Sequence, residues 1–201
     1  MHGGHSGTSP IPGKARFPRA WSDGTVVDAL VDVAKYPDDR PRPLADFDGG
    51  DGWICDGERD GVRLRVILEA DGAIWTGHPL DGDGVTRNPR SGRAAGDLRA
   101  FFALEESLLR SLLPGLDRSG DTAAQASFIR EEDAAGEWSL AVGTLVHTLV
   151  RTGADLSARD RAGLARLAAM IGESGGPDRR ALAERYARLL ETAPGGSPGP
   201  G

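Results

Sequence analysis

The sequence predicts an α+β protein in which a small domain, built from one helix and an antiparallel sheet, is followed by an all-α helical bundle. Three observations lead to this prediction. Glycine, proline and aspartate are abundant over residues 1–90, whereas alanine, leucine, arginine and glutamate dominate residues 97–192. Apolar residues alternate with others over residues 62–69, just ahead of a turn. From residue 101 to residue 190, apolar positions instead recur at helical spacing.

These composition shifts predict four segments along the chain. We expect a first domain over residues 1–90, a linker over 91–96 and a helical domain over 97–192. Residues 193–201 consist of glycine, proline and serine after Ala193 and offer no side chains to bury, so we expect a disordered tail. With 201 residues, the chain is long enough for two domains that each bury a core.

The first domain opens with an amphipathic helix. Ser22 or Asp23 can cap it, and Pro37 ends it. Its inward positions are expected to be Val26, Val27, Leu30, Val31 and Ala34.

A loop over residues 38–51 and three strands are expected next. The strands cover residues 53–56, 62–69 and 73–76, and Asp71-Gly72 is a strong signal for the hairpin that joins the last two. In the middle strand, an apolar face lies opposite a partly basic face that carries Arg63 and Arg65.

Five helices are expected in the second domain. The first covers residues 101–113 and is stopped by Pro114-Gly115, and the second covers 122–132. The third covers 138–150 and is closed by Gly153. A capping box of Ser157 and Asp160 opens the fourth, and Leu182, Tyr186, Leu189 and Leu190 face inward from the fifth.

Composition also limits the class of protein. The formal net charge of -6 argues against a broad electrostatic grip on nucleic acid but allows a local basic site. The single cysteine, Cys55, rules out a disulfide within the chain and is expected to be a small buried residue. No apolar run approaches the ~20 residues that span a bilayer. Because no leader precedes the first domain, we expect the protein to be cytoplasmic as expressed.

Groups able to move protons and bind phosphate concentrate near the start of the chain. His2 and His5 are of the residue type that can move protons near neutral pH, and Lys14 and Arg16, which can hold a phosphate, follow at short range. No third and fourth ligands appear at zinc-site spacing, so neither a metal nor a cofactor is expected. The alternative is that the two histidines belong to a tail without function.

Simpler structural roles stay open for the other candidate residues. His78, before Pro79 at a strand end, is either a turn residue or part of a site. Arg63 and Arg65 lie on a solvated face or contact an RNA backbone. Trp53 and Trp75 are core residues or stack on bases.

Short motifs of the first domain follow one another in a distinctive order. They are Gly3-Gly4-His5, Pro12-Gly13-Lys14 with Phe17-Pro18, Trp21-Ser22-Asp23, Asp60-Gly61-Val62, Thr76-Gly77-His78-Pro79 and Arg87-Asn88-Pro89. This ordered series, over residues 2–89, resembles the bacterial EndoU family, similar to the C-terminal nuclease toxins of polymorphic and contact-dependent secreted effectors. In the family, Arg-Asn-Pro commonly ends the toxin, so finding it at residues 87–89 indicates a fusion.

The resemblance implies metal-independent cleavage of RNA, with tRNA as one candidate, to 2′,3′-cyclic phosphate and 5′-hydroxyl ends. It implies that His5 is the acid or base and that the Thr76 hydroxyl contacts the scissile phosphate. Lys14 would bind phosphate, with Arg16, Arg63 and Arg65 as further candidates. It further implies that the toxin half derives from a secreted effector acting in the cytoplasm of a target cell.

Two positions depart from the family pattern. The family's other catalytic histidine lies upstream of Gly-Gly-His, at a position before Met1, and its Thr-Gly-Tyr-Pro tyrosine is His78 here. Three alternatives follow. The chain is a piece of a longer protein, or its site is impaired, or His2 or His78 has taken the missing role.

The helical domain loosely resembles the small immunity proteins encoded beside such toxins. That resemblance implies contact between toxin and immunity domains, within one chain or between chains. An acidic surface of Glu131, Glu132, Asp133 and Glu137 would cover the phosphate site. Two other hypotheses are a catalytically impaired binding or decoy protein, and an interaction protein in which the helical half is the active party.

Overall fold

The computed structural model describes residues 13–47, 50–89, 99–173 and 177–192. The chain divides into two compact units, residues 1–95 and residues 96–201. The described part of the first unit contains one helix and six strands, and that of the second contains five helices. The α+β class expected from the sequence is therefore confirmed. The linker over 91–96 and the tail over 193–201 lie outside the described residues.

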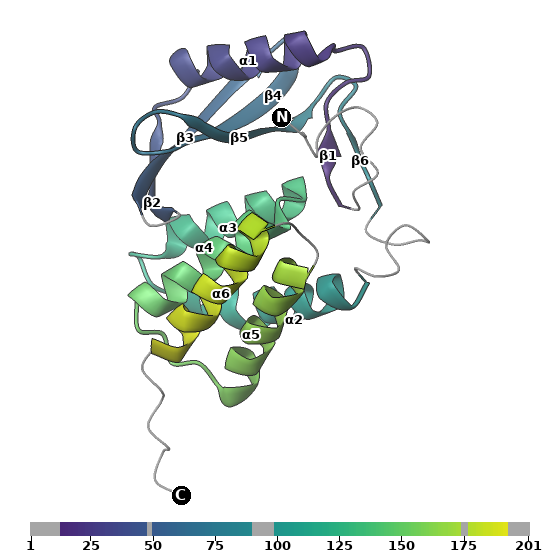
Figure 1. The fold of residues 1–201 in the computed structure, drawn as a ribbon. Coiled ribbons are helices and arrows are strands. Elements are labelled where there is room, and N and C mark those ends of the chain that lie inside the picture. The colour runs from purple at the N-terminus through teal and green to yellow at the C-terminus, as the bar shows by residue number, and fades with distance from the viewer. Residues whose placement is uncertain (1–12, 48–49, 90–98, 174–176, 193–201) are drawn as a thin grey trace, which may run out of the picture. The chain divides into compact units, whose positions relative to one another are not determined.

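The first unit is a helix on one face of an antiparallel sheet (Figure 1). Strands β2 to β5 form a four-stranded sheet in chain order, and β1 and β6 form a separate two-stranded ladder. The elements are β1 (Ala15–Arg16), α1 (Asp23–Lys35), β2 (Arg42–Phe47), β3 (Gly50–Arg59), β4 (Val62–Leu68), β5 (Ile74–Gly82) and β6 (Thr86–Arg87).

Helix α1 begins and ends where the sequence predicts. The Ser22 hydroxyl accepts a hydrogen bond from the backbone N–H of Thr25 at 3.1 Å, and Pro37 follows the last turn. The buried stripe is centred on Leu30 and Val33. Val27, expected to face inward, lies at the edge of this stripe and is exposed, so that assignment was wrong.

Two glycines allow α1 to pack closely against the sheet. A Cβ atom at Gly77 of β5 would lie 2.6 Å from Leu30 Cδ2, and one at Gly57 of β3 would lie 3.1 Å from Val33 Cγ2. Phe17 and buried side chains of β3 and β4 complete this core, among them Cys55 of β3, which is buried as expected. The face of the sheet that holds Gly57 and Gly77 is therefore the face that α1 covers.

The sheet is larger than the sequence predicts. The segment 38–51, expected to be a loop, contains β2, because its backbone completes a ladder with β3 even though its side chains do not alternate. β3 and β5 also extend beyond the predicted 53–56 and 73–76. The Asp71-Gly72 hairpin is confirmed: Gly72 has φ 86°, and the Asp71 carboxylate accepts from the Ala73 N–H at 2.9 Å.

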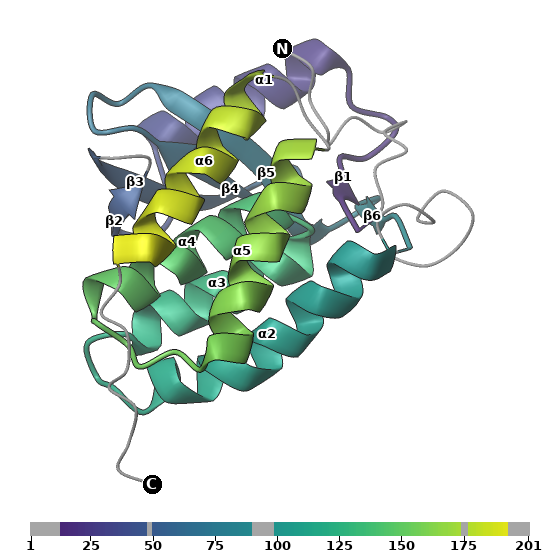
Figure 2. The same cartoon turned by 60° about the horizontal axis from the view of Figure 1, so that its bottom comes forward.

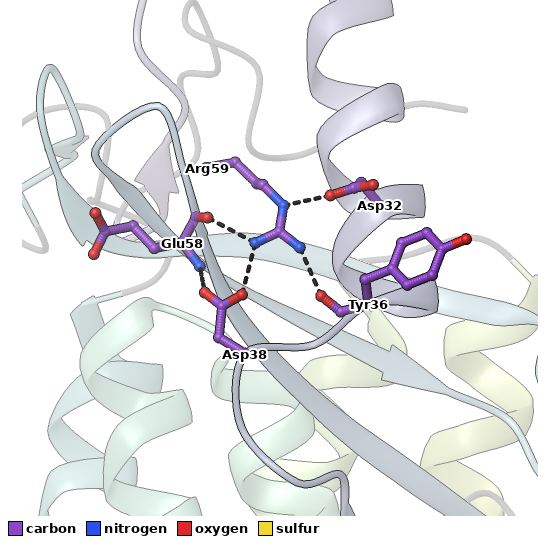
Figure 3. Close-up of polar contacts among 5 residues, drawn as sticks. All are labelled: Asp32, Tyr36, Asp38, Glu58 and Arg59. Carbon is purple, nitrogen blue, oxygen red and sulfur yellow. Dashed lines mark hydrogen bonds and ion pairs between the residues drawn. The ribbon is translucent and has the colours of Figure 1, made fainter.

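Arg59, at the end of β3, joins the sheet to the end of α1 (Figure 3). Its guanidinium donates to Asp32 at 2.5 Å, to Asp38 at 3.0 Å and to the carbonyl oxygen of Tyr36 at 2.6 Å. The backbone N–H of Glu58 also donates to Asp38, and this bond together with Arg59 lowers the pKa of the Asp38 carboxyl. The cluster fixes the position of the α1–β2 connection against β3.

The second unit is a bundle of five helices, in which α5 and α6 lie side by side (Figure 2). Aliphatic and aromatic side chains from its helices form one core. Of those predicted to face inward from the fifth helix, Tyr186 and Leu190 are buried in it and Leu189 packs against it, whereas Leu182 lies outside those whose side chains are described. The helices are α2 (Arg99–Asp117), α3 (Ala123–Ala135), α4 (Trp138–Arg151), α5 (Ala158–Glu173) and α6 (Pro177–Thr192).

Helix ends in this unit agree with the sequence at some points and not at others. The capping box is confirmed, since Ser157 Oγ accepts from the Asp160 N–H at 3.0 Å. Pro114-Gly115 does not stop α2, which continues to Asp117 because Leu116 is still buried in the core. Among the described residues, no helix is long and apolar enough to cross a bilayer.

The acidic surface expected on the helical unit is smaller than predicted. Glu132 and Glu137 are buried, with exposed fractions of 0% and 5%, so they do not contribute to it. Helical periodicity explains Glu132, which lies three residues after the buried Ile129. Glu131 and Asp133 keep part of their surface exposed.

Gly77→Ala should destabilise the first unit by about 1–3 kcal/mol, because the added methyl group overlaps Leu30 and pushes α1 from the sheet. The measurement is hydrogen exchange of the β3–β5 amides, since two units need not unfold together. The matched control is the same substitution in a Leu30→Ala background, where the space is vacant. If Gly77→Ala lowered the stability of the first unit equally in the parent and in the Leu30→Ala background, the close packing of Leu30 on Gly77 would be contradicted.

Candidate functional site

The candidate site lies on the sheet face opposite α1. In the β4–β5 ladder, Ile67 pairs with Thr76 and Arg65 pairs with His78. Since alternate residues of a strand share a face, Thr76 and His78 point to the side away from Gly77 and α1. His78 is buried in the middle of β5, so its predicted place at a strand end, and with it the alternative of a turn residue, was wrong.

A carboxylate with two guanidinium partners lies beside this pair. Asp56 of β3 is opposite Arg65 in the ladder and binds it through both oxygens, at 2.7 Å to Nε and 2.8 Å to Nη2. Arg42 of β2 donates to the same carboxylate at 2.8 Å. Asp56, Arg65 and His78 thus form one cross-strand row over three neighbouring strands.

The electrostatics of Asp56 follow from this arrangement. Burial raises the pKa of its carboxyl, but hydrogen bonds and charge from Arg65 and then Arg42 outweigh burial and hold the pKa below its ordinary value. The carboxylate therefore stays charged over the physiological range. Of the two arginines, Arg42 is the more accessible, with its side chain 45% exposed.

The two arginines of β4 differ in their surroundings. Arg65 was expected on a solvated face, but its side chain is 2% exposed and its charge is bound by Asp56. The reason is that this face also carries Ile54 and Ile67, which are buried. Arg63 is on the same face and exposed, and it pairs with Asp81 at 3.1 Å.

Lys14 and Arg16 lie on the two-stranded ladder rather than on the four-stranded sheet. The backbone N–H of Gly13 donates to the carbonyl of Asn88, and that of Asn88 donates to the carbonyl of Lys14, both at 3.0 Å. The Gly-Lys and Arg-Asn-Pro segments are therefore adjacent, although some 70 residues apart in the chain. Lys14 is buried, and Arg16 Nε donates to the Thr86 hydroxyl at 3.2 Å.

Not every predicted site residue can be placed. His2 and His5 lie outside the described residues. Within the described ranges, no group of three or more His, Cys, Asp or Glu side chains could hold a metal ion. Trp53 and Trp75 were expected in the core, but they are 42% and 41% exposed.

Sequence reasoning missed Arg42 and Asp56, although one signal could have found Asp56. Asp60-Gly61 forms a two-residue turn in which both residues have positive φ, 49° and 72°. Such a turn pairs the residues that are equidistant from it, so it places Asp56 opposite Arg65. Arg42 had no comparable signal, because nothing in the sequence marks β2.

Comparison of the chain with family models, curated proteins and solved structures finds no match. The likeness of its motifs to the EndoU family therefore depends on the residues themselves.

Asp56→Asn should lower the free energy of unfolding of the first unit by about 3–5 kcal/mol at neutral pH, because Arg65 then lacks its counter-charge. The pKa of Asp56 is depressed in the folded state, so its contribution is present above the unfolded value of about 3.9 and is lost as pH falls below it. The difference in the free energy of unfolding between Asp56→Asn and the parent should therefore become smaller as the pH falls below that value.

Asp81→Asn is the control, because its pair with Arg63 is exposed and worth no more than about 1 kcal/mol. Amide hydrogen exchange of β3 and β4 against pH measures both variants. If Asp56→Asn lowered the free energy of unfolding by no more than Asp81→Asn does, the stabilising role of the Arg42–Asp56–Arg65 network would be refuted.

Proposed function

We propose that residues 1–90 are an EndoU-type, barnase-like endoribonuclease domain that cleaves RNA, such as tRNA, without a metal. The observation that carries the proposal is the β4–β5 register, which puts Thr76 and His78 on one face beside the Arg42–Asp56–Arg65 network. A hydroxyl, an imidazole and guanidinium groups are the donors that an RNA phosphate needs as negative charge develops on it.

The proposed reaction is a transesterification within RNA. A base removes the proton of a ribose 2′-hydroxyl, the 2′-oxygen attacks the adjacent phosphorus, and the bond from phosphorus to the 5′-oxygen breaks. An acid gives that oxygen a proton. His5 takes one of these roles and His78 or His2 the other, while the Thr76 hydroxyl and Arg42 donate to the phosphate.

We further propose that the helical unit is an inhibitory, immunity-like domain. Glu131 and Asp133 are the residues of the expected acidic surface that stay partly exposed on α3, and an acidic surface complements a face that binds phosphates. A covalent tether raises the effective concentration of such an inhibitor, so modest affinity suffices for inhibition. The resemblance to immunity proteins is the second support.

One observation favours a second candidate function, RNA or partner binding without cleavage. Arg65 is already bound by Asp56, and His78, which stands in place of the family's tyrosine, is buried. A site so arranged could keep its specificity while proton transfer is impaired.

The nuclease proposal predicts cleavage when the two units are separated. A protease site is placed within residues 91–96 of the full chain, and tRNA is incubated with intact and cut protein in a metal chelator. Cut protein should produce 2′,3′-cyclic phosphate ends faster than intact protein, because cutting removes the tether. Thr76→Ala should lower the rate about 100- to 1,000-fold, as loss of one transition-state donor does.

The matched control is Thr25→Ala, which removes a hydroxyl on α1, at the opposite face of the sheet. It should leave the rate unchanged. If neither form of the protein cleaves RNA but both bind it, the binding function stands in place of the nuclease. Equal rates of cleavage by intact and cut protein would refute the inhibitory role of the helical unit but not the nuclease activity of residues 1–90.

A further inference from the structure

A second row of charged side chains lies on the face of the candidate site. Gly57 is on the α1 side, so alternation along β3 puts Glu58 on the opposite face. In the register of the sheet, Glu58 is directly opposite Arg63, and Arg63 is directly opposite Asp81 of β5. The three residues form a cross-strand row next to the row of Asp56, two residues along β3.

This second row is accessible to a ligand. The side chains of Arg63 and Asp81 are 57% and 61% exposed, and Glu58 is exposed as well. The arginine of the first row, Arg65, is 2% exposed and bound by Asp56. Of the two arginines of β4, Arg63 is therefore the one that can donate to a molecule from solution.

Among the described residues, Arg63 binds only one of its two acidic neighbours. Its Nη1 donates to Asp81 at 3.1 Å. The Glu58 carboxylate has no hydrogen bond or ion pair within the described part of the chain, and it points away from the Arg59 cluster (Figure 3). A carboxylate acceptor and a guanidinium donor thus stand on adjacent strands without binding each other.

We propose that Glu58 and Arg63 bind the Watson–Crick edge of a guanine base, which makes guanine-containing single-stranded RNA the substrate of this face. The proposal rests on the proposed function of the face. Guanine has donors at two neighbouring positions, N1–H and N2–H, which fit the two oxygens of one carboxylate, and its O6 accepts from a guanidinium. No other RNA base has two neighbouring donors on that edge, so another base would leave the carboxylate less well satisfied.

Charge and spacing both favour a base at this row. Two carboxylates against one guanidinium disfavour a phosphate there and favour a group that donates hydrogen bonds. Strands rise about 3.3 Å per residue, so the two rows lie about 7 Å apart along β3. A ribose can span that separation, which leaves the adjoining phosphate at the row of Asp56. Unpaired RNA bases are commonly read on this edge.

The test is binding of fluorescent, 2′-O-methylated RNA trinucleotides, which cannot be cleaved, to the full chain, both intact and cut within residues 91–96. The central base is guanine or inosine, which lacks only the N2 amino group, and the flanking bases are uracil. The parent should bind the guanine form about 10-fold more tightly, because inosine loses one hydrogen bond to a carboxylate.

Glu58→Ala should abolish this preference, because both donors of guanine then lose their acceptor. Arg63→Ala should weaken binding of the guanine and inosine forms alike, by about 5- to 150-fold, because both bases keep O6. The matched control is Asp28→Ala, which removes an exposed carboxylate from α1 on the other side of the sheet and should bind like the parent. Misfolding would not change the ratio of the two affinities in this way.

Equal affinity of the parent for guanine and inosine would overturn the proposal, as would a guanine preference that survives in Glu58→Ala. Failure of both the intact and the cut parent to bind either trinucleotide would overturn it too. Guanine-selective binding without cleavage of the matching unmodified RNA would contradict the nuclease proposal and leave the guanine site intact. Cleavage without guanine-selective binding would do the reverse.

Discussion

The close approach of α1 to the sheet is the constraint on which the rest of the first unit depends. At Gly77, even one methyl group would overlap Leu30, so any side chain at this position disturbs the packing beneath the helix. Because side chains alternate along a strand, this fixes the two neighbours, Thr76 and His78, on the other face. The Thr-Gly-His-Pro sequence thus has a structural explanation: the glycine allows the helix to approach the sheet, and its two neighbours lie on the opposite face, which holds the candidate site.

The opposite face is organised by Asp56. Its carboxylate binds side chains from β2 and β4, and the same row continues to His78 on β5, so four strands contribute to one surface. Arg59 has the matching role on the other side, where it ties α1 and the loop after it to β3. One arginine cluster therefore stabilises the packing of the helix, and the other fixes the positions of the candidate site residues.

Local signals in the sequence predicted the elements that depend on local physics. The Ser22 cap, the Asp71-Gly72 turn and the Ser157–Asp160 capping box each involve residues within three positions of one another, and each is confirmed. The predictions that were wrong concern elements that depend on contacts between residues distant in sequence. β2 forms because β3 offers a partner, and α2 passes Pro114 because Leu116 is buried in the core.

The candidate site was predictable in part. Thr76 and His78 were named from a motif and Arg65 from the alternation along a strand, and the structure brings them to one face. The bulge at Trp75 was not predictable, because a register change depends on both strands at once. Arg42 was missed with β2, and His2 and His5 lie outside the described residues.

The central claim is the register of β4 against β5, and nuclear Overhauser effects between the two strands measure it directly. The account predicts cross-strand contacts from Arg65 to His78, from Ile67 to Thr76 and from Leu68 to Ile74. Contacts from Arg65 to Gly77 and from Ile67 to Trp75 would mean a slip of one residue. Such a slip would turn Thr76 and His78 toward α1 and contradict the proposed site.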